Sequence, residues 1–218
     1  MARLSHLGST APLRRELFPL GFAGEVMLLA LETWLDFSMN REVRKETRIT
    51  AVFRDAMIAA YVAAGRSWFI TLEDSITDPT FGTELGRNDL RFYPPNHHGQ
   101  TIFFTIECKR LRVTTASGFR ELSDKYVDEG VSRFVNGKYS AYLPCGGMIG
   151  YVMDNESANA LVSVLAEIKL KAVAVKLRNP DGILSPSRLL DHETSADTFH
   201  ERDDGTFELH HLLVGVMA

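Results

Sequence analysis

The chain has 218 residues, of which 45% are hydrophobic and 24% charged, with a formal net charge of −4. This balance is typical of a globular protein with a sizeable core. It excludes a protein that coats nucleic acid by bulk positive charge, but it leaves room for a local basic surface. No apolar run of about 18 residues and no secretory leader pattern occurs, so we expect no membrane span and a cytoplasmic location.

The first third of the chain predicts an N-terminal arm and two helices. Residues 1–23 mix glycine, proline and basic side chains, which is typical of a loosely structured arm. Residues 24–37 are rich in helix formers, and residues 40–64 carry apolar side chains at helical spacing. We expect both helices to pack on a core.

Three strands are predicted next. Residues 68–72 form a short aromatic and β-branched run, and a turn-rich stretch follows over 74–87. Residues 89–93 predict a second strand that ends at two prolines, and residues 101–109 predict a third. Residues 96–99, between the second and third of these strands, predict a hairpin-like loop.

The remainder of the chain alternates between helical and extended patterns. Helical spacing returns over 122–138, where Val127, Val131, Phe134 and Val135 share one side. Further segments are a strand at 146–153, a helix from Asn155 or Ser157 to about Leu170, a strand at 172–175, a polar tail and a final strand at 206–214. The pattern predicts one α/β domain over 1–218, with a core at 40–153, a C-terminal part at 154–218 and a mixed central β-sheet flanked by helices.

Charged side chains meet on one face of the third predicted strand. Side chains alternate along a strand, so Glu107 and Lys109 share a face while Cys108 faces the core. If the preceding strand pairs with this one, Asp89 lies across from Glu107. Two adjacent carboxylates repel each other, and a bound divalent cation relieves the repulsion. Mg²⁺ or Mn²⁺ is the ion that such oxygen ligands favour.

Asp89, a gap of 17 residues and then Glu107-Cys108-Lys109 on a following strand resemble the signature of the PD-(D/E)XK, or restriction-endonuclease-like, nuclease superfamily. The predicted helix-strand-strand-strand-helix-strand order is similar too, and the resemblance covers about 46–153. It implies a metal held by Asp89, Glu107 and the Cys108 backbone carbonyl, with Lys109 acting on the attacking water. Asn88 stands where the family name has proline.

The resemblance also implies an assisting carboxylate on the helix before the first core strand, and Glu46 fits that position. Its alternative role is to place a negative charge in the first turn of a helix, where the helix dipole favours it. A Glu-x-Lys tripeptide alone is weak evidence, since Glu167-Ile168-Lys169 is a second copy. That copy lies in a helical segment, where side chains two apart point in different directions.

A basic set follows the motif and predicts contact with a nucleic-acid backbone. Its members are Arg110, Arg112, Lys125, Tyr126 and Arg133. Tyr126 and Arg133 are seven residues apart and share a helix side distinct from the valine face. A solvated helix face is the alternative explanation for these charges. The resemblance favours DNA over RNA, cleaved as part of restriction, repair or phage defence, with a homodimer or a separate subunit choosing the target.

Two rival functions stay open. A catalytically silent protein of the same fold would serve as a binding or scaffolding subunit. A metal-independent enzyme would use His200 or His210 as a base, although the histidine spacing matches no metal motif. Cys108 and Cys145 lie far apart without a paired Cys/His cluster, so we expect neither a disulfide nor a structural zinc.

Overall fold

The computed structural model describes residues 11–37, 45–72, 75–77, 84–87, 89–95, 101–178 and 182–216. The helices are α1 (Ala11–Glu16), α2 (Phe22–Asp36), α3 (Glu46–Ala63), α4 (Ser123–Tyr126), the π-helix η1 (Val127–Val131), α5 (Ser132–Val135) and α6 (Ser157–Leu170). The strands are β1 (Phe69–Leu72), β2 (Ser75–Thr77), β3 (Glu84–Arg87), β4 (Leu90–Tyr93), β5 (Phe104–Leu111), β6 (Val113–Thr115), β7 (Gly118–Arg120), β8 (Cys145–Val152), β9 (Ile183–Leu184), β10 (Ser195–Arg202) and β11 (Gly205–Gly215).

Seven strands form one mixed sheet in the order β1-β4-β5-β8-β11-β10-β9. The strands β1, β4 and β5 form an antiparallel meander. From β5 the chain crosses through α4, η1 and α5 to β8, which runs parallel to β5. The strand β11 pairs in parallel with β8 and antiparallel with β10. The predicted α/β class with a mixed, helix-flanked sheet is therefore confirmed. From α3 to β8 the strands of the main sheet and the helices follow the predicted order, but the unpredicted strands β2, β3, β6 and β7 lie between them.

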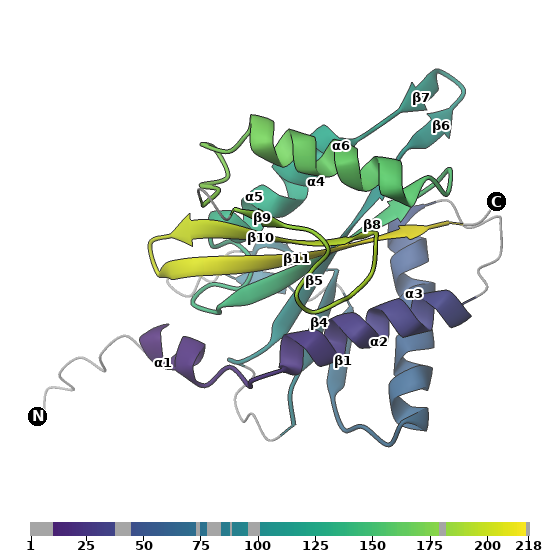
Figure 1. The fold of residues 1–218 in the computed structure, drawn as a ribbon. Coiled ribbons are helices and arrows are strands. Elements are labelled where there is room, and N and C mark those ends of the chain that lie inside the picture. Colours follow the sequence, from purple (N-terminus) through teal and green to yellow (C-terminus); the bar gives the residue numbers. More distant parts are fainter. Residues whose placement is uncertain are drawn as a thin grey trace, which may run out of the picture.

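Helices cover both faces of the sheet (Figure 1). The helices α2 and α3 lie on one face, where they enclose a buried cluster that includes Met27, Phe53 and Ile106. The segments α4, η1, α5 and α6 lie on the other face, over a second cluster that includes Phe134 and Leu213. This two-sided cover explains why every residue of the central strand β8 is buried.

Close packing on β8 depends on glycine. A Cβ atom added at Gly146 would lie 2.5 Å from Cε1 of Phe134. The absence of a side chain lets the ring of Phe134 rest directly on the strand, where it also stacks on Phe207. Gly146 thus sets the separation between α5 and the sheet.

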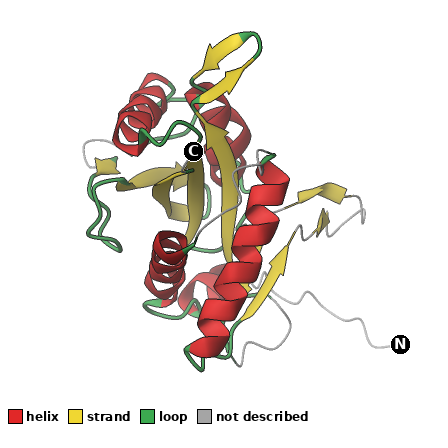
Figure 2. Cartoon of the chain, turned by 90° about the vertical axis from the view of Figure 1, so that its right-hand side faces the viewer, coloured by secondary structure: helices red, strands yellow, loops and turns green. Residues whose placement is uncertain are grey.

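Two small hairpins lie outside the main sheet. The hairpin of β6 and β7 projects beyond it, past α6 (Figures 1 and 2). The pair β2 and β3 falls within 74–87, a stretch that the sequence predicts as turn-rich. The two short strands were not predicted, because turn-forming residues dominate the sequence of this stretch.

Several predicted elements are corrected. Within the predicted arm, α1 forms and α2 begins at Phe22. The predicted strand 172–175 is a series of turns, with the side chain of Val173 94% exposed, because a short apolar run does not by itself distinguish a strand from other structures. The strand β10 replaces part of the predicted polar tail. Asn88, the loop 96–99 and residues 40–44 of the second predicted helix lie outside the described residues.

No helix in the described part of the chain has the length and apolar character needed to cross a bilayer.

Candidate active site

The candidate site lies where β4 stops and β5 continues. Leu90, the first residue of β4, pairs with Ile106, so the register continued by one residue sets Asp89 opposite Glu107. This is the pairing that the sequence predicts. Beyond it β5 runs on to Leu111 without β4 beside it.

Carboxylates occupy this open edge of β5. The Cys108 N–H donates to Asp89 Oδ2 at 2.7 Å, and the Arg110 N–H donates to Glu46 Oε2 at 2.8 Å. Each carboxylate satisfies a backbone donor that the missing strand would otherwise have satisfied. Asp89 and Glu46, which are far apart in the sequence, are thereby fixed along one strand edge.

Glu107 is the most deeply buried charged group of the site. Its side chain is 2% exposed, and its Oε1 accepts from Lys109 Nζ at 2.7 Å and from Arg133 Nη1 at 3.0 Å. Its Oε2 is buried and has no hydrogen-bond partner among the described residues. A buried carboxylate oxygen without a donor is costly. The bare oxygen marks a position that a cation or a proton would stabilise.

Lys109 links the carboxylates. Its Nζ donates to Glu107 Oε1, donates to the Cys108 carbonyl at 3.0 Å and lies 3.6 Å from Glu46 Oε1. The face sharing predicted for Glu107 and Lys109 is confirmed. Cys108 faces the opposite side, where it joins the buried core. The ammonium group therefore sits among the groups to which the sequence assigns a metal.

Burial and mutual repulsion shift the ionisation of these groups. Burial, and then the charge of Asp89, raise the pKa of Glu107 to about 7. Burial also raises the pKa of Asp89, although Lys109 and the Cys108 N–H partly oppose it. Burial alone would lower the pKa of Lys109, but the Glu107 and Glu46 carboxylates raise it above its ordinary value. Lys109 therefore stays protonated, and the pKa values of Glu107 and Asp89 both lie above their usual range.

Arg133 enters the site from the helical crossover. Its Nη1 donates to Glu107 and, at 2.9 Å, to the Tyr139 hydroxyl, while its side chain stays 34% exposed. The turn of π-helix before it packs closely, because a Cβ at Gly130 would lie 2.4 Å from Cε of Met148. A π-turn inserts an extra residue into the helix and rotates everything after it. Arg133 is the second residue after this π-turn.

The other members of the basic set have different surroundings. Arg112 pairs with Glu121 and Asp154, both at 2.9 Å, and Lys125 lies 3.7 Å from Glu129 at the surface. The prediction that Tyr126 lies on an outer side of the helix is wrong. Tyr126 is fully buried, so in this structure it is closed to a phosphate backbone.

The donor set fits a hard divalent cation. Asp89, Glu107 and the Cys108 carbonyl supply oxygen atoms only, which Mg²⁺ and Mn²⁺ prefer. The bare Oε2 of Glu107 is an unsatisfied acceptor, and burial is the largest cause of the raised pKa of both carboxyls, so a cation would offset the cost of their ionised forms. Glu46, Asp89 and Glu107 do not converge as a compact three-donor group in the described chain. An ion here would complete its shell with the carbonyl, with water and with a ligand oxygen.

The two histidines proposed as bases, His200 and His210, are both buried, and His200 belongs to a hydrogen-bond chain that also includes His211. His200 Nδ1 faces the Val175 carbonyl at 2.7 Å and therefore carries the proton, so its Nε2 accepts from Thr198 Oγ1. Thr198 in turn accepts from His211 Nε2, and His211 Nδ1 accepts from the Tyr126 hydroxyl. All four side chains of this hydrogen-bond chain are buried. Burial keeps both imidazoles neutral by lowering the pKa of His200 to about 4 and that of His211 to about 3.

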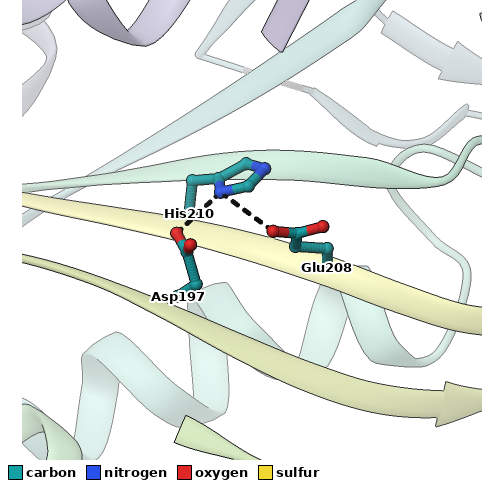
Figure 3. Close-up of side chains that lie close together, drawn as sticks. All are labelled: Asp197, Glu208 and His210. Atoms are coloured by element: carbon teal, nitrogen blue, oxygen red, sulfur yellow. Dashed lines mark hydrogen bonds and ion pairs between the residues drawn. The ribbon is translucent and has the colours of Figure 1, made fainter. Parts of the chain in front are cut away.

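A second polar cluster was missed by the sequence reasoning. Asp197 on β10 lies opposite His210 on β11, and Glu208 precedes His210 by two residues on the same face (Figure 3). His210 Nδ1 lies 2.8 Å from Asp197 Oδ1 and 3.7 Å from Glu208 Oε1. The pairing was not predictable without β10. The spacing of Glu208 and His210 on the predicted final strand was the only available signal.

Comparisons with protein-family models, with curated proteins and with solved structures gave no match to this chain.

Proposed function

We propose that this chain is a metal-dependent nuclease of the PD-(D/E)XK type that hydrolyses phosphodiester bonds, with DNA as the preferred substrate. The observation that carries the proposal is Glu107, buried beside Lys109 and Asp89 with one oxygen bare. Stability alone gives no reason to bury a carboxylate in this way. A site that binds a cation and a phosphate does.

The residues divide the work as follows. Asp89, Glu107 and the Cys108 carbonyl would hold Mg²⁺ or Mn²⁺, which when bound polarises the phosphate and neutralises its developing charge. Lys109 stays protonated and donates hydrogen bonds, so it orients the attacking water and stabilises negative charge on the phosphate. Glu46 lies 3.6 Å from the same ammonium and is 30% exposed, so it is the carboxylate left to accept the proton of the water.

With these roles, hydrolysis of the phosphodiester needs no reagent other than water. The water oxygen forms a bond to phosphorus, and the opposite phosphorus–oxygen ester bond breaks. The proton of the water goes to Glu46, and the leaving oxygen takes a proton from solvent. Arg133, whose side chain is 34% exposed beside Glu107, is placed to bind a phosphate oxygen.

We assign the selection of a target sequence to contacts outside the metal-binding residues. Lys125 at the surface and the exposed part of Arg133 lie on the helical crossover that follows β5, where a nucleic-acid backbone would lie. A second copy of the chain or a separate targeting subunit would supply sequence selection, as in a restriction or phage-defence system.

The experiment is a cleavage assay with the purified full chain. Plasmid, linear duplex, single-stranded DNA and RNA are each incubated with Mg²⁺, Mn²⁺ or EDTA. We expect cleavage of DNA with either metal and none with EDTA, and a loss of at least a hundredfold in Asp89→Asn and Lys109→Ala. The matched control is Lys169→Ala, which alters the second Glu-x-Lys copy on α6 and should cleave like the wild type.

One observation favours the rival role of a silent scaffold. Lys109 and Arg133 already neutralise Glu107 Oε1, so the fold has a partial substitute for the metal. The scaffold role replaces the nuclease proposal if two results are found together. No substrate is cut, and calorimetry detects no Mn²⁺ binding that depends on Asp89, so that the wild type and Asp89→Asn give the same signal. Mn²⁺ binding without cleavage would point instead to a missing activator or substrate.

A further inference from the structure

The face of β10 and β11 toward α2 carries a second group of metal-type donors, away from the candidate active site. His210 Nδ1, a carboxylate oxygen of Asp197 and one of Glu208 all lie within 4.8 Å of one another. Asp197 and His210 are buried, and Glu208 is 22% exposed. Within the described part of the chain this is the one such group of three.

The three donors are held by rigid elements. Asp197 and His210 are paired residues of adjacent antiparallel strands, and Glu208 shares the strand and the face of His210. Asp197 is oriented from outside by the Ser187 hydroxyl at 2.6 Å and by the Arg188 N–H at 2.7 Å. Such outer donors fix the direction of a ligating carboxylate.

The separations suit a small ion. Ligands about 2.1 Å from a tetrahedral zinc lie about 3.4 Å from one another. The two distances from His210 Nδ1, 2.8 Å and 3.7 Å, bracket that value. One imidazole nitrogen with two carboxylate oxygens favours Zn²⁺ and its transition-metal neighbours over Mg²⁺ or Ca²⁺, which prefer oxygen alone.

The places that an ion would take are held by groups that can move away. In the Nδ1–H tautomer of His210 the hydrogen fills the gap to Asp197, and the Arg188 guanidinium pairs with Glu208 and lies 3.9 Å from Asp197. Arg188 is 55% exposed, so it can leave without opening the core. Binding would place the imidazole hydrogen of His210 on Nε2 and displace the Arg188 guanidinium, while the bonds from the Ser187 hydroxyl and the Arg188 N–H to Asp197 stay intact.

From this geometry we infer that Asp197, Glu208 and His210 form a second metal site, for a zinc-class divalent ion with water in its fourth position. The site ties β10 to β11 and stands apart from the proposed nuclease function. Arg188 is its counter-ion in the metal-free state.

The test is titration of the full chain with Zn²⁺ after treatment with EDTA, followed by calorimetry and by thermal unfolding. We expect a Zn²⁺ site that persists in Glu107→Gln and raises the melting temperature, with at least tenfold weaker binding at this site in Glu208→Gln and several-fold tighter binding in Arg188→Ala. Glu201→Gln, an exposed glutamate on the same hairpin, is the matched control and should bind like the wild type. Glu107→Gln should also bind Zn²⁺ at this site unchanged, which separates the site from the nuclease centre.

Because His210 is buried, its substitution risks misfolding, and the test therefore rests on the two partly exposed residues, Glu208 and Arg188. The inference is overturned if the wild type binds no Zn²⁺, or if Glu208→Gln binds it as tightly as the wild type. It is also overturned if Arg188→Ala weakens binding, since Arg188 would then be part of the binding group rather than its competitor.

Discussion

Replacing Glu107 by glutamine should stabilise the protein while it abolishes metal binding. In the folded state burial raises the pKa of Glu107 to about 7 from an ordinary value of 4.5. The folded state therefore holds this proton more tightly than the unfolded state does. As pH rises from 4.5 to 7, ionisation of Glu107 lowers the free energy of unfolding. Above pH 7 this loss has reached its full size and no longer changes with pH.

The magnitude follows from the size of the shift. A difference of about 2.5 pKa units corresponds to about 3 kcal/mol at pH 8. Glutamine keeps the side-chain shape and one acceptor oxygen for Lys109 and Arg133, but it carries no charge to be buried. We expect Glu107→Gln to unfold at higher urea concentration than the wild type at pH 8 without metal, with a gain that vanishes near pH 4.5.

Urea unfolding followed by circular dichroism at several pH values measures the effect. Glu167→Gln is the control, because Glu167 forms an i,i+4 surface pair with Lys171 that should change stability by less than about 1 kcal/mol. Adding Mn²⁺ should stabilise the wild type and leave Glu107→Gln unaffected. A variant that is less stable than the wild type at pH 8, or a difference independent of pH, would refute the reasoning.

Three further outcomes are expected. Arg133→Ala should bind Mn²⁺ several-fold more tightly and cleave DNA at least tenfold more slowly, because it removes a cation that shares Glu107; equal losses of both would mean that Arg133 only supports the fold. In a Glu107→Gln background, stability should fall by about 1.4 kcal/mol per pH unit for each of His200 and His211 as pH drops below 6.5 toward 4, and equal urea midpoints at pH 7.5 and pH 5 would contradict this. Tyr126→Phe should cost about 1 kcal/mol by removing the first donor of the histidine chain, measured in the same way at pH 7.5.

Local rules were sufficient to predict the centre of the site. Strand alternation placed Glu107 and Lys109 together, and a short connection between two strands placed Asp89 opposite Glu107. The contact of Glu46 with the Arg110 N–H depends instead on how α3 crosses the sheet. The sequence gives no measure of that angle, so the helix position predicted for Glu46 left two roles open.

Features that depend on a shift of register or on buried polar pairs were not predictable. The π-turn inserts one residue between Tyr126 and Arg133, so the two side chains lie on different sides of the helical segment although they are seven residues apart. The strand β10 has polar residues at buried positions, such as Asp197 and His200, because each finds a partner on a neighbouring element. A hydrophobic pattern cannot report a strand whose buried side chains are satisfied by hydrogen bonds.

The surroundings shift carboxyl pKa values in opposite directions in the two clusters of the sheet, upward at Glu107 and downward at Asp197. Burial raises the pKa of Glu107 and one of its oxygens has no donor, so an added cation would relieve a cost that is already present. Burial also acts on Asp197, but His210, Ser187 and the Arg188 N–H more than offset it and lower the pKa of Asp197. A cation there must instead displace the Arg188 guanidinium. The first cluster should therefore accept a hard ion readily, whereas the second should require an ion that binds imidazole nitrogen strongly enough to replace the contacts that already stabilise Asp197.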